Sequence, residues 1–313
     1  MGGSDDAGCR DTGSRRAGAR AVLNVMESRE RHDQAGVVIK RNTAKSFGYL
    51  WAQERLAGVQ RGYHYQAQIK PWLPPGHLRG RVLDAGCGSG MDTFQMAQEH
   101  DGQVIAVELS REGVTHTQGR TRAFPNVMPI QGDVEALSFR DGSFDFVYSY
   151  GVLHHLPNPE QGFRELVRVL KPGGVIAIYV YEDFSTHAGL ERALLWWVGV
   201  MRRLTVRFPA PLLYRLCQLC APLVFVTLTM PATLLARWTM TSPLSQRIPF
   251  RHGRSFFGLS GDLYDRFSAP LEQRYSRQDV ERWFAGAKLQ EVTVIVQRGW
   301  VAYGRKPAAD PAP

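Results

Sequence analysis

The feature that most constrains the fold of this 313-residue chain is an apolar run that leads directly into alternating glycines. Val82-Leu83-Asp84-Ala85 is followed by Gly86-Cys87-Gly88-Ser89-Gly90, and a stretch with helical spacing begins at Met91. Glycines at alternate positions let the backbone turn sharply and approach a ligand closely, and the start of a helix presents free N–H groups. The sequence therefore predicts a nucleotide-like cofactor at the carboxyl end of this strand.

Short apolar runs alternate with helical stretches along most of the chain from Arg81 to Arg305. The expected strands are 81–85, 104–108, 127–131, 144–148, 175–179, 292–296 and 300–303, and the expected helices are 91–99, 111–122, 159–170 and 276–285. This alternation favours a doubly wound, mostly parallel α/β sheet of seven strands. Only Gln297-Arg298-Gly299 separate the last two strands, so we expect them to form a C-terminal antiparallel hairpin.

Three segments of different composition flank or interrupt this alternation. Residues 1–36 are rich in Gly, Ser, Asp and Arg with little apolar periodicity, so we expect a disordered leader. Residues 37–80 place aromatic side chains at helical spacing and are expected to form an N-terminal helical arm. The cofactor-binding domain is expected over 81–181 and 276–306, with a hydrophobic helical insertion over 182–275, after the fifth strand.

The insertion contains the most apolar part of the chain. The 21 residues from Leu216 to Ala236 carry no charge, which reaches the lower range for a membrane span, but Pro222 and Pro231 divide them and arginines frame them. A helical hairpin with basic edges, centred on residues 190–238, fits better as a lid, a homodimer surface or a peripheral membrane anchor. The sequence leaves these three roles open.

Two acids follow neighbouring strands at the same expected sheet edge. Glu108 ends the second strand, where a carboxylate can accept hydrogen bonds from ribose hydroxyls, and Asp133 follows the third, where it can accept from an adenine amino group. A dinucleotide fingerprint would place its third glycine at position 91, which is methionine here. A nicotinamide-dependent oxidoreductase is therefore disfavoured, although it stays an alternative.

Taken together, these motifs resemble the class I S-adenosylmethionine-dependent methyltransferases, in particular the small-molecule group that includes the quinone-ring methyltransferases. The resemblance covers roughly residues 80–180 and rests on motifs in the order Val82–Gly90, Val104–Ser110, Gly132-Asp133, Phe139–Asp145, Leu153–Leu156, Glu165–Leu170 and Lys171-Pro172-Gly173-Gly174. We expect the last of these to be a structural turn into the fifth strand.

The resemblance implies a Rossmann-like fold, S-adenosyl-L-methionine as cofactor, and O- or C-methylation of a hydrophobic quinone, polyketide, lipid or aromatic acceptor. It also implies a set of cofactor-binding residues. Asp84, Gly86, Gly88 and Gly90 would hold the amino-acid end, Glu108 the ribose, Asp133 and Val134 the adenine, and Ser149 and Tyr150 would lie beside the reactive methyl.

Two adjacent histidines follow the fourth strand, near the expected position of the methyl group. A general base is needed only if the acceptor must lose a proton, and an imidazole can take that proton near neutral pH. His155 and His154 are the candidates, with a slight preference for His155. Further acceptor-side candidates are Tyr63, His64, Tyr65, Tyr179 and Tyr181.

The amino-acid composition limits which binding partners and which cellular compartment we expect. The formal net charge is +9, but the arginines are spread along the chain without a recognisable nucleic-acid module, so we do not expect a nucleic-acid substrate. Four scattered cysteines predict no disulfide framework and favour a cytoplasmic protein, peripheral to the membrane if the insertion is an anchor. Cys217 and Cys220 have metal-ligand spacing but lack a second pair, so no metal is expected. A non-catalytic membrane or assembly protein that keeps the cofactor fold is a further alternative.

Overall fold

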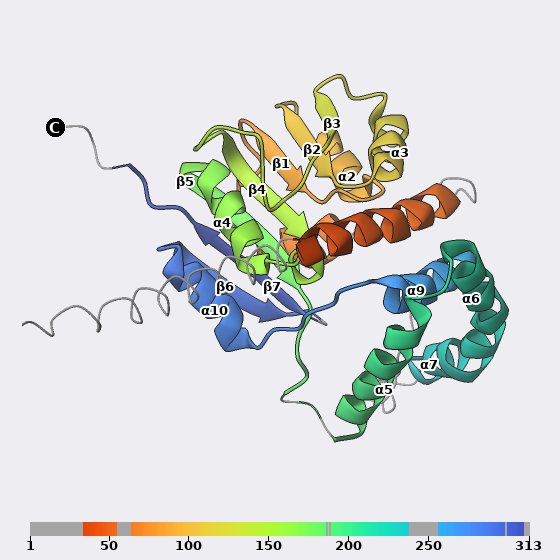
Figure 1. Ribbon diagram of the computed structural model, residues 1–313. Helices are drawn as coiled ribbons and strands as arrows, with labels where there is room; N and C mark the ends of the chain where they lie inside the picture. Colours follow the sequence, from red (N-terminus) through yellow and green to blue (C-terminus); the bar gives the residue numbers. More distant parts are fainter. Residues whose placement is uncertain are drawn as a thin grey trace, which may run out of the picture.

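A single seven-stranded sheet organises the protein. The computed structural model describes residues 34–54, 64–185, 187, 189–237, 256–297 and 299–309, and the remainder of the predicted leader, residues 1–33, lies outside this range. The strand order is β3-β2-β1-β4-β5-β7-β6 (Figure 1). The strands are β1 (Val82–Ala85), β2 (Val104–Glu108), β3 (Val127–Gln131), β4 (Phe144–Tyr150), β5 (Leu170–Val180), β6 (Gln290–Val296) and β7 (Trp300–Arg305).

The pairing of these strands confirms the predicted fold class. Strands β1 to β5 are parallel, whereas β7 runs antiparallel to both β5 and β6 and closes a C-terminal hairpin. From β1 the chain moves outward to β3 and then returns to pair β4 on the other side of β1. The carboxyl end of β1 is therefore the switch point at which doubly wound sheets bind ligands.

One predicted turn is part of a strand. Lys171-Pro172-Gly173-Gly174 was expected to precede the fifth strand, but β5 begins at Leu170 and shifts register against β4 across this motif. Gly173 has φ +74°, which only glycine adopts readily, and its N–H donates to the Lys306 carbonyl. The Lys171 ammonium pairs with Asp145 at 2.7 Å. These contacts fix the motif as a bulge at the amino end of β5.

Helices cover both faces of the sheet. On one face α4 (Pro159–Val169) and α10 (Arg277–Gly286) pack in the larger core cluster, because their buried side chains recur at helical spacing. On the other face lie α2 (Met91–Glu99) and the helical turn η1 (Tyr65–Ile69), which share a second cluster with β1, β4 and β5. Helix α3 (Arg111–Thr121) contacts α2 and β3.

The expected N-terminal arm consists of one long helix and a short helical region. The long helix spans residues 34–54, so it begins inside the stretch assigned to the leader, where Gln34 and Ala35 are compatible with helix. We call it the N-terminal helix. The short region comprises η1 and η2 (Lys70–Trp72). Tyr63 lies outside the described residues.

The insertion forms a separate group of helices beside the sheet (Figure 1). It contains α5 (Gly189–Thr205), α6 (Ala210–Val224), η4 (Phe225–Thr229), α7 (Met230–Leu235) and α9 (Phe256–Ser268). Its two ends lie together, because Glu182 and Tyr275 form an isolated β-bridge. Helix α9 contacts both α5 and α6, and the buried residues of this group enclose Leu50 of the N-terminal helix. The insertion is thus joined to the sheet through the N-terminal helix.

Helix α10 offers a local test of the fold. Ser276 accepts a hydrogen bond from the Asp279 N–H, and the Asp279 carboxylate accepts from the Ser276 N–H at 2.8 Å, so both members of a capping box are present. We predict that Ser276→Ala lowers the free energy of unfolding by about 1 kcal/mol in urea denaturation, because an N–H loses its acceptor. Ser276→Thr, which keeps the hydroxyl, is the control. An equal loss in both variants would contradict the capping role.

Candidate functional site

The glycine loop between β1 and α2 has a backbone that side chains would not permit. Gly86, Gly88 and Gly90 have φ of +85°, +55° and +74°. A Cβ on Gly90 would lie 2.8 Å from the backbone of Thr117, and one on Gly88 would lie 2.9 Å from the ring of Trp51. The backbone of the loop therefore packs directly against α3 and against the Trp51 ring of the N-terminal helix. Only glycine fits at these positions, as in loops whose backbone binds a cofactor.

Asp84 lies at the carboxyl half of β1 and is almost completely buried. Its carboxylate accepts a hydrogen bond from the Thr93 hydroxyl at 2.5 Å. Burial, together with the nearby charges of Asp92 and Glu108, raises the pKa of Asp84 to about 8. A buried carboxylate with this pKa is stabilised in its charged form by a cation, and the ammonium of an amino-acid group would be such a cation.

Glu108 ends β2 and connects the glycine loop to the start of α3. One carboxylate oxygen accepts from the Gly88 N–H at 3.1 Å, and the other accepts from the N–H and the hydroxyl of Ser110 at 2.9 and 2.8 Å. Burial raises the pKa of Glu108, and these hydrogen bonds oppose the shift. A carboxylate has about four acceptor positions, and donors of the protein itself occupy at least three of them in this conformation.

Asp133 follows β3 and is held by a residue that the sequence analysis missed. The Lys40 ammonium of the N-terminal helix lies 2.6 Å from Asp133 and 2.5 Å from Glu135. The other Asp133 oxygen accepts from the Glu135 N–H. The neighbouring Val134 packs in the core cluster. Lys40 therefore competes for the carboxylate that was predicted to bind the adenine amino group.

The N-terminal helix covers this edge of the sheet with a series of contacts. Besides Lys40, the Trp51 ring lies against Gly88, and the Phe47 ring lies 5.2 Å from the His155 ring, measured between centroids. The aromatic spacing of Phe47 and Trp51 was the signal in the sequence, but it indicated only a buried helix face. Which part of the protein that face covers depends on long-range packing.

Ser149 and Tyr150, predicted to lie beside the methyl group, have different environments at the end of β4. Ser149 is fully buried and donates to the Ala85 carbonyl at 2.9 Å, which ties β4 to β1. Tyr150 stacks between His64 and Tyr179, with centroid distances of 4.2 and 4.3 Å. The structure thus joins Tyr150 with two of the predicted acceptor-side rings, His64 and Tyr179, into one aromatic wall.

The two histidines are both buried but differ in hydrogen bonding. His154 is fully buried and stacks on Tyr181 at 3.8 Å, and its ring nitrogens have no hydrogen-bond partner among the described residues. Burial holds the pKa of His154 well below its usual value. The Nδ1 of His155 lies 2.7 Å from the Leu271 carbonyl, which selects the tautomer with a proton on Nδ1. Nε2 of His155 is then the unprotonated nitrogen, so this placement favours His155 as a base.

The edge fits the chemistry of S-adenosylmethionine in three respects. The glycine loop admits no Cβ, and the buried Asp84 calls for a cation. In addition, the indole N–H of Trp51 is buried against the loop without a hydrogen-bond partner in the described part of the chain, so it is a donor available to a ligand carboxylate or hydroxyl. These are features of three separate elements that meet at the predicted site.

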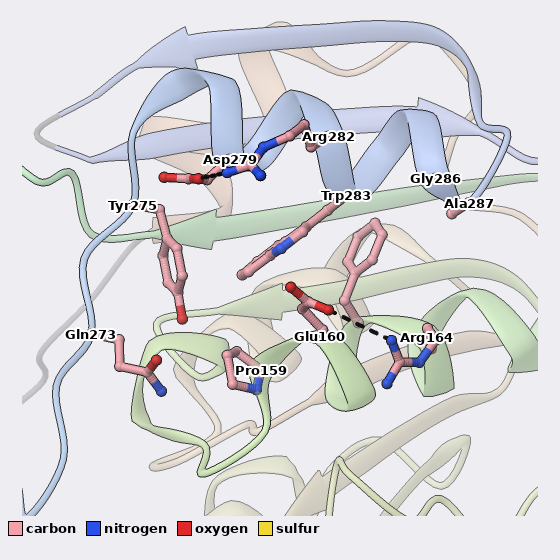
Figure 2. Close-up of a pocket in the computed structure, with 11 residues that line it drawn as sticks. Pro159, Glu160, Arg164, Gln273, Tyr275, Asp279, Arg282, Trp283, Gly286 and Ala287 are labelled. Carbon is pink, nitrogen blue, oxygen red and sulfur yellow. Dashed lines mark hydrogen bonds and ion pairs between the residues drawn. The ribbon is translucent and has the colours of Figure 1, made fainter.

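A cavity of about 420 Å³ lies elsewhere, between α4 and α10. Figure 2 shows its aromatic side chains, Tyr275 and Trp283, with the ion pairs Glu160–Arg164 and Asp279–Arg282 at its border. None of its lining residues is among the predicted cofactor-binding or catalytic residues. We therefore do not assign the cofactor to this cavity.

Comparisons with known proteins find a related domain in the part of the chain that carries this site. A family model described as a methyltransferase domain matches residues 83–178. The chain is 33% identical over 140 residues to the 2-methyl-6-phytyl-1,4-hydroquinone methyltransferase of Synechocystis sp., covering 44% of this chain and 42% of that protein. It is 33% identical over 114 residues to the 27-O-demethylrifamycin SV methyltransferase of Amycolatopsis mediterranei, covering 36% and 42%. The chain thus spans less than half the length of these relatives.

Among solved structures, the protein resembles a SAM-dependent methyltransferase from Methanosarcina mazei, with a TM-score of 0.45 and 16% identity over 77% of this chain and 97% of that one. It also resembles a chain from the complex between the Haloferax volcanii Trm112 methyltransferase activator and a putative methyltransferase, with a TM-score of 0.48 and 16% identity over 83% and 97%.

The sheet order, the glycine loop at its switch point and the matching family model define a nucleotide-type cofactor domain of the α/β class. Residues 83–178, which match the methyltransferase domain model, include the glycine loop, Glu108 and Asp133. S-adenosyl-L-methionine is the cofactor that the similarity of this region implies. The assignment of individual cofactor-binding and catalytic residues stays a prediction.

The glycine loop can be tested by adding one methyl group. We predict that Gly90→Ala lowers the free energy of unfolding by about 1–3 kcal/mol, because its φ of +74° and its contact with the Thr117 backbone both oppose a Cβ. Gly119→Ala, on α3, is a matched control because nothing lies within 4 Å of its Cβ position. Urea denaturation of both variants measures the effect, and equal stabilities would argue against a tight approach at Gly90.

The raised pKa of Asp84 predicts a pH-dependent affinity for S-adenosylmethionine. Below pH 8 the free site is mostly protonated, and a bound ammonium favours the charged carboxylate, so binding releases a proton. Affinity should rise with pH between about 6 and 7.5, by at most roughly tenfold per pH unit. Isothermal titration calorimetry should show a flatter dependence in Asp84→Asn. If the affinity of Asp84→Asn changed with pH as steeply as that of the unmodified protein, Asp84 would not contact the cofactor.

Proposed function

We propose that this protein transfers a methyl group from S-adenosylmethionine to a hydrophobic small molecule, by O- or C-methylation of a quinone, polyketide, lipid or aromatic acceptor. The observation that carries the proposal is the aromatic wall of His64, Tyr150 and Tyr179, which stands at the end of β4 and β5 beside the glycine loop. Stacked rings at this position suit a flat or apolar acceptor. The quinone and rifamycin acceptors in the names of two relatives are consistent with this chemistry.

The protein's own residues would contribute alignment and exclusion of water. The cofactor, when bound, would supply a methyl carbon that an acceptor nucleophile attacks in line while the carbon–sulfur bond breaks and S-adenosylhomocysteine leaves, so positioning can provide much of the acceleration. Trp51 and Phe47 of the N-terminal helix cover the sheet edge and keep water from it. His155, oriented by the Leu271 carbonyl, would accept the proton of an acceptor hydroxyl.

Two alternatives are separated from this proposal by binding measurements. A nicotinamide-dependent oxidoreductase should bind NADH, and a non-catalytic membrane or assembly protein should transfer no methyl group to any acceptor. Titration of the purified protein with S-adenosylmethionine, S-adenosylhomocysteine and NADH, followed by transfer of a radiolabelled methyl group to a panel of quinones and phenols, distinguishes all three. Binding of NADH alone would overturn the proposal.

The role of His155 has its own test. We predict that His155→Gln lowers kcat by about 10²–10⁴-fold for a hydroxyl acceptor while affinity for S-adenosylmethionine is retained, because only proton removal is affected. His154→Gln is the comparison, since His154 is fully buried. An unchanged kcat and pH profile in His155→Gln would show that no base is supplied by this residue.

A further inference from the structure

The helices of the insertion expose apolar stripes where a water-soluble helix would be polar. On α6, η4 and α7 the exposed side chains recur every three or four residues, and they are Leu212, Leu216, Leu219, Leu223, Val226, Met230 and Leu234. The most exposed are Leu219 and Leu223, at 76% and 66%. The opposite side of α6 packs against α9 through residues such as Leu213 and Ala221. The helix is therefore apolar on both sides, although only one side has a protein partner among the described residues.

Helix α5 carries a second stripe with the same property. Leu194, Trp197, Met201 and Leu204 are exposed at spacings of three and four residues, and Trp196 lies beside them at 61% exposure. An exposed apolar surface of this extent indicates a binding surface. Exposed tryptophans next to aliphatic side chains are typical of residues at the boundary between lipid and water.

The charge of this segment indicates which partner binds the exposed apolar stripes. From Arg192 to Arg237 the sequence contains six arginines and no lysine, aspartate or glutamate. Arg202 pairs with Glu272 of the segment after α9, whereas Arg203, Arg207 and Arg215 are exposed. A second copy of the chain placed on these stripes would bring like charges together, while an anionic lipid surface would attract them.

We propose that the insertion docks on an anionic membrane surface through the stripes of α5 and α6–α7, with the exposed arginines at the lipid headgroups. Figure 1 shows these helices beside the sheet, away from β1 to β3, so docking leaves the cofactor domain in water. Ala210–Leu235 is also long and apolar enough to cross a membrane, with 17% of its apolar window buried. Its packing against α9, through Leu213 and Ala221, favours a surface position over a span.

The test is sedimentation of the full chain with phosphatidylcholine vesicles that contain or lack phosphatidylglycerol, without cofactor or acceptor. We expect binding to the anionic vesicles that high salt reverses. Leu219→Glu/Leu223→Glu should weaken partitioning by on the order of a hundredfold, and each of Arg203→Gln, Arg207→Gln and Arg215→Gln by up to roughly fivefold. Met128→Glu/Val296→Glu makes the same change at exposed apolar residues of the edge strands β3 and β6 and should bind normally.

Circular dichroism and thermal melting establish that each variant is folded before it is compared. Unchanged vesicle binding by the folded Leu219→Glu/Leu223→Glu protein would overturn the proposal, as would binding that resists high salt and alkaline carbonate, which would indicate a membrane span. A lipid-free dimer that ignores vesicles and dissociates in the double variant would assign the stripes to a second copy instead. Because no methyl transfer is measured, the outcome is independent of the proposed catalytic activity.

Discussion

The hydrogen bonds that Glu108 accepts from Gly88 and Ser110 join three elements at the edge of the sheet. They fix the glycine loop after β1, the end of β2 and the first turn of α3 around one buried carboxylate. Such a group is costly to bury unless donors surround it. The loop conformation satisfies that requirement, and it also leaves Asp84 with one hydroxyl donor, from Thr93, in a buried position. The same hydrogen bonds that hold this edge together therefore also prepare it for a polar, partly cationic ligand.

The N-terminal helix has two faces with separate partners. Lys40, Phe47 and Trp51 contact the cofactor edge, whereas Leu50 is enclosed by α6 and α9, and the Ser46 hydroxyl donates to the Ser268 carbonyl of α9 at 3.2 Å. Any displacement of the insertion must therefore either carry this helix along or break its buried contacts. A contact made by the insertion can in this way change how closely Trp51 lies on the glycine loop.

Local sequence patterns were sufficient for the sheet, but not for its surroundings. The runs at 104–108 and 127–131 coincide with β2 and β3. Strand β2 lies between two neighbours and is apolar and buried along most of its length, whereas β3 is a half-exposed edge strand that its apolar residues still mark. Phe47 and Trp51 signalled a buried helix face without indicating its target, and Lys40 carried no signal at all. Their contacts join residues far apart in the sequence, such as Lys40 and Asp133 or Phe47 and His155, and such pairs depend on the path of the whole chain. For the same reason, His155 could be placed after β4 from sequence, whereas its tautomer required the Leu271 carbonyl.

The bridge between Glu182 and Tyr275 brings the two ends of the insertion into register, directly after β5 and shortly before α10. A segment whose ends already meet can be lengthened, shortened or exchanged with little effect on the strands that flank it. The methyltransferase family model ends at residue 178, just before this junction. The contacts of the insertion can therefore change while the cofactor domain stays constant. A chimera joined at Glu182 and Tyr275 would be the simplest way to give one cofactor domain a new location or acceptor.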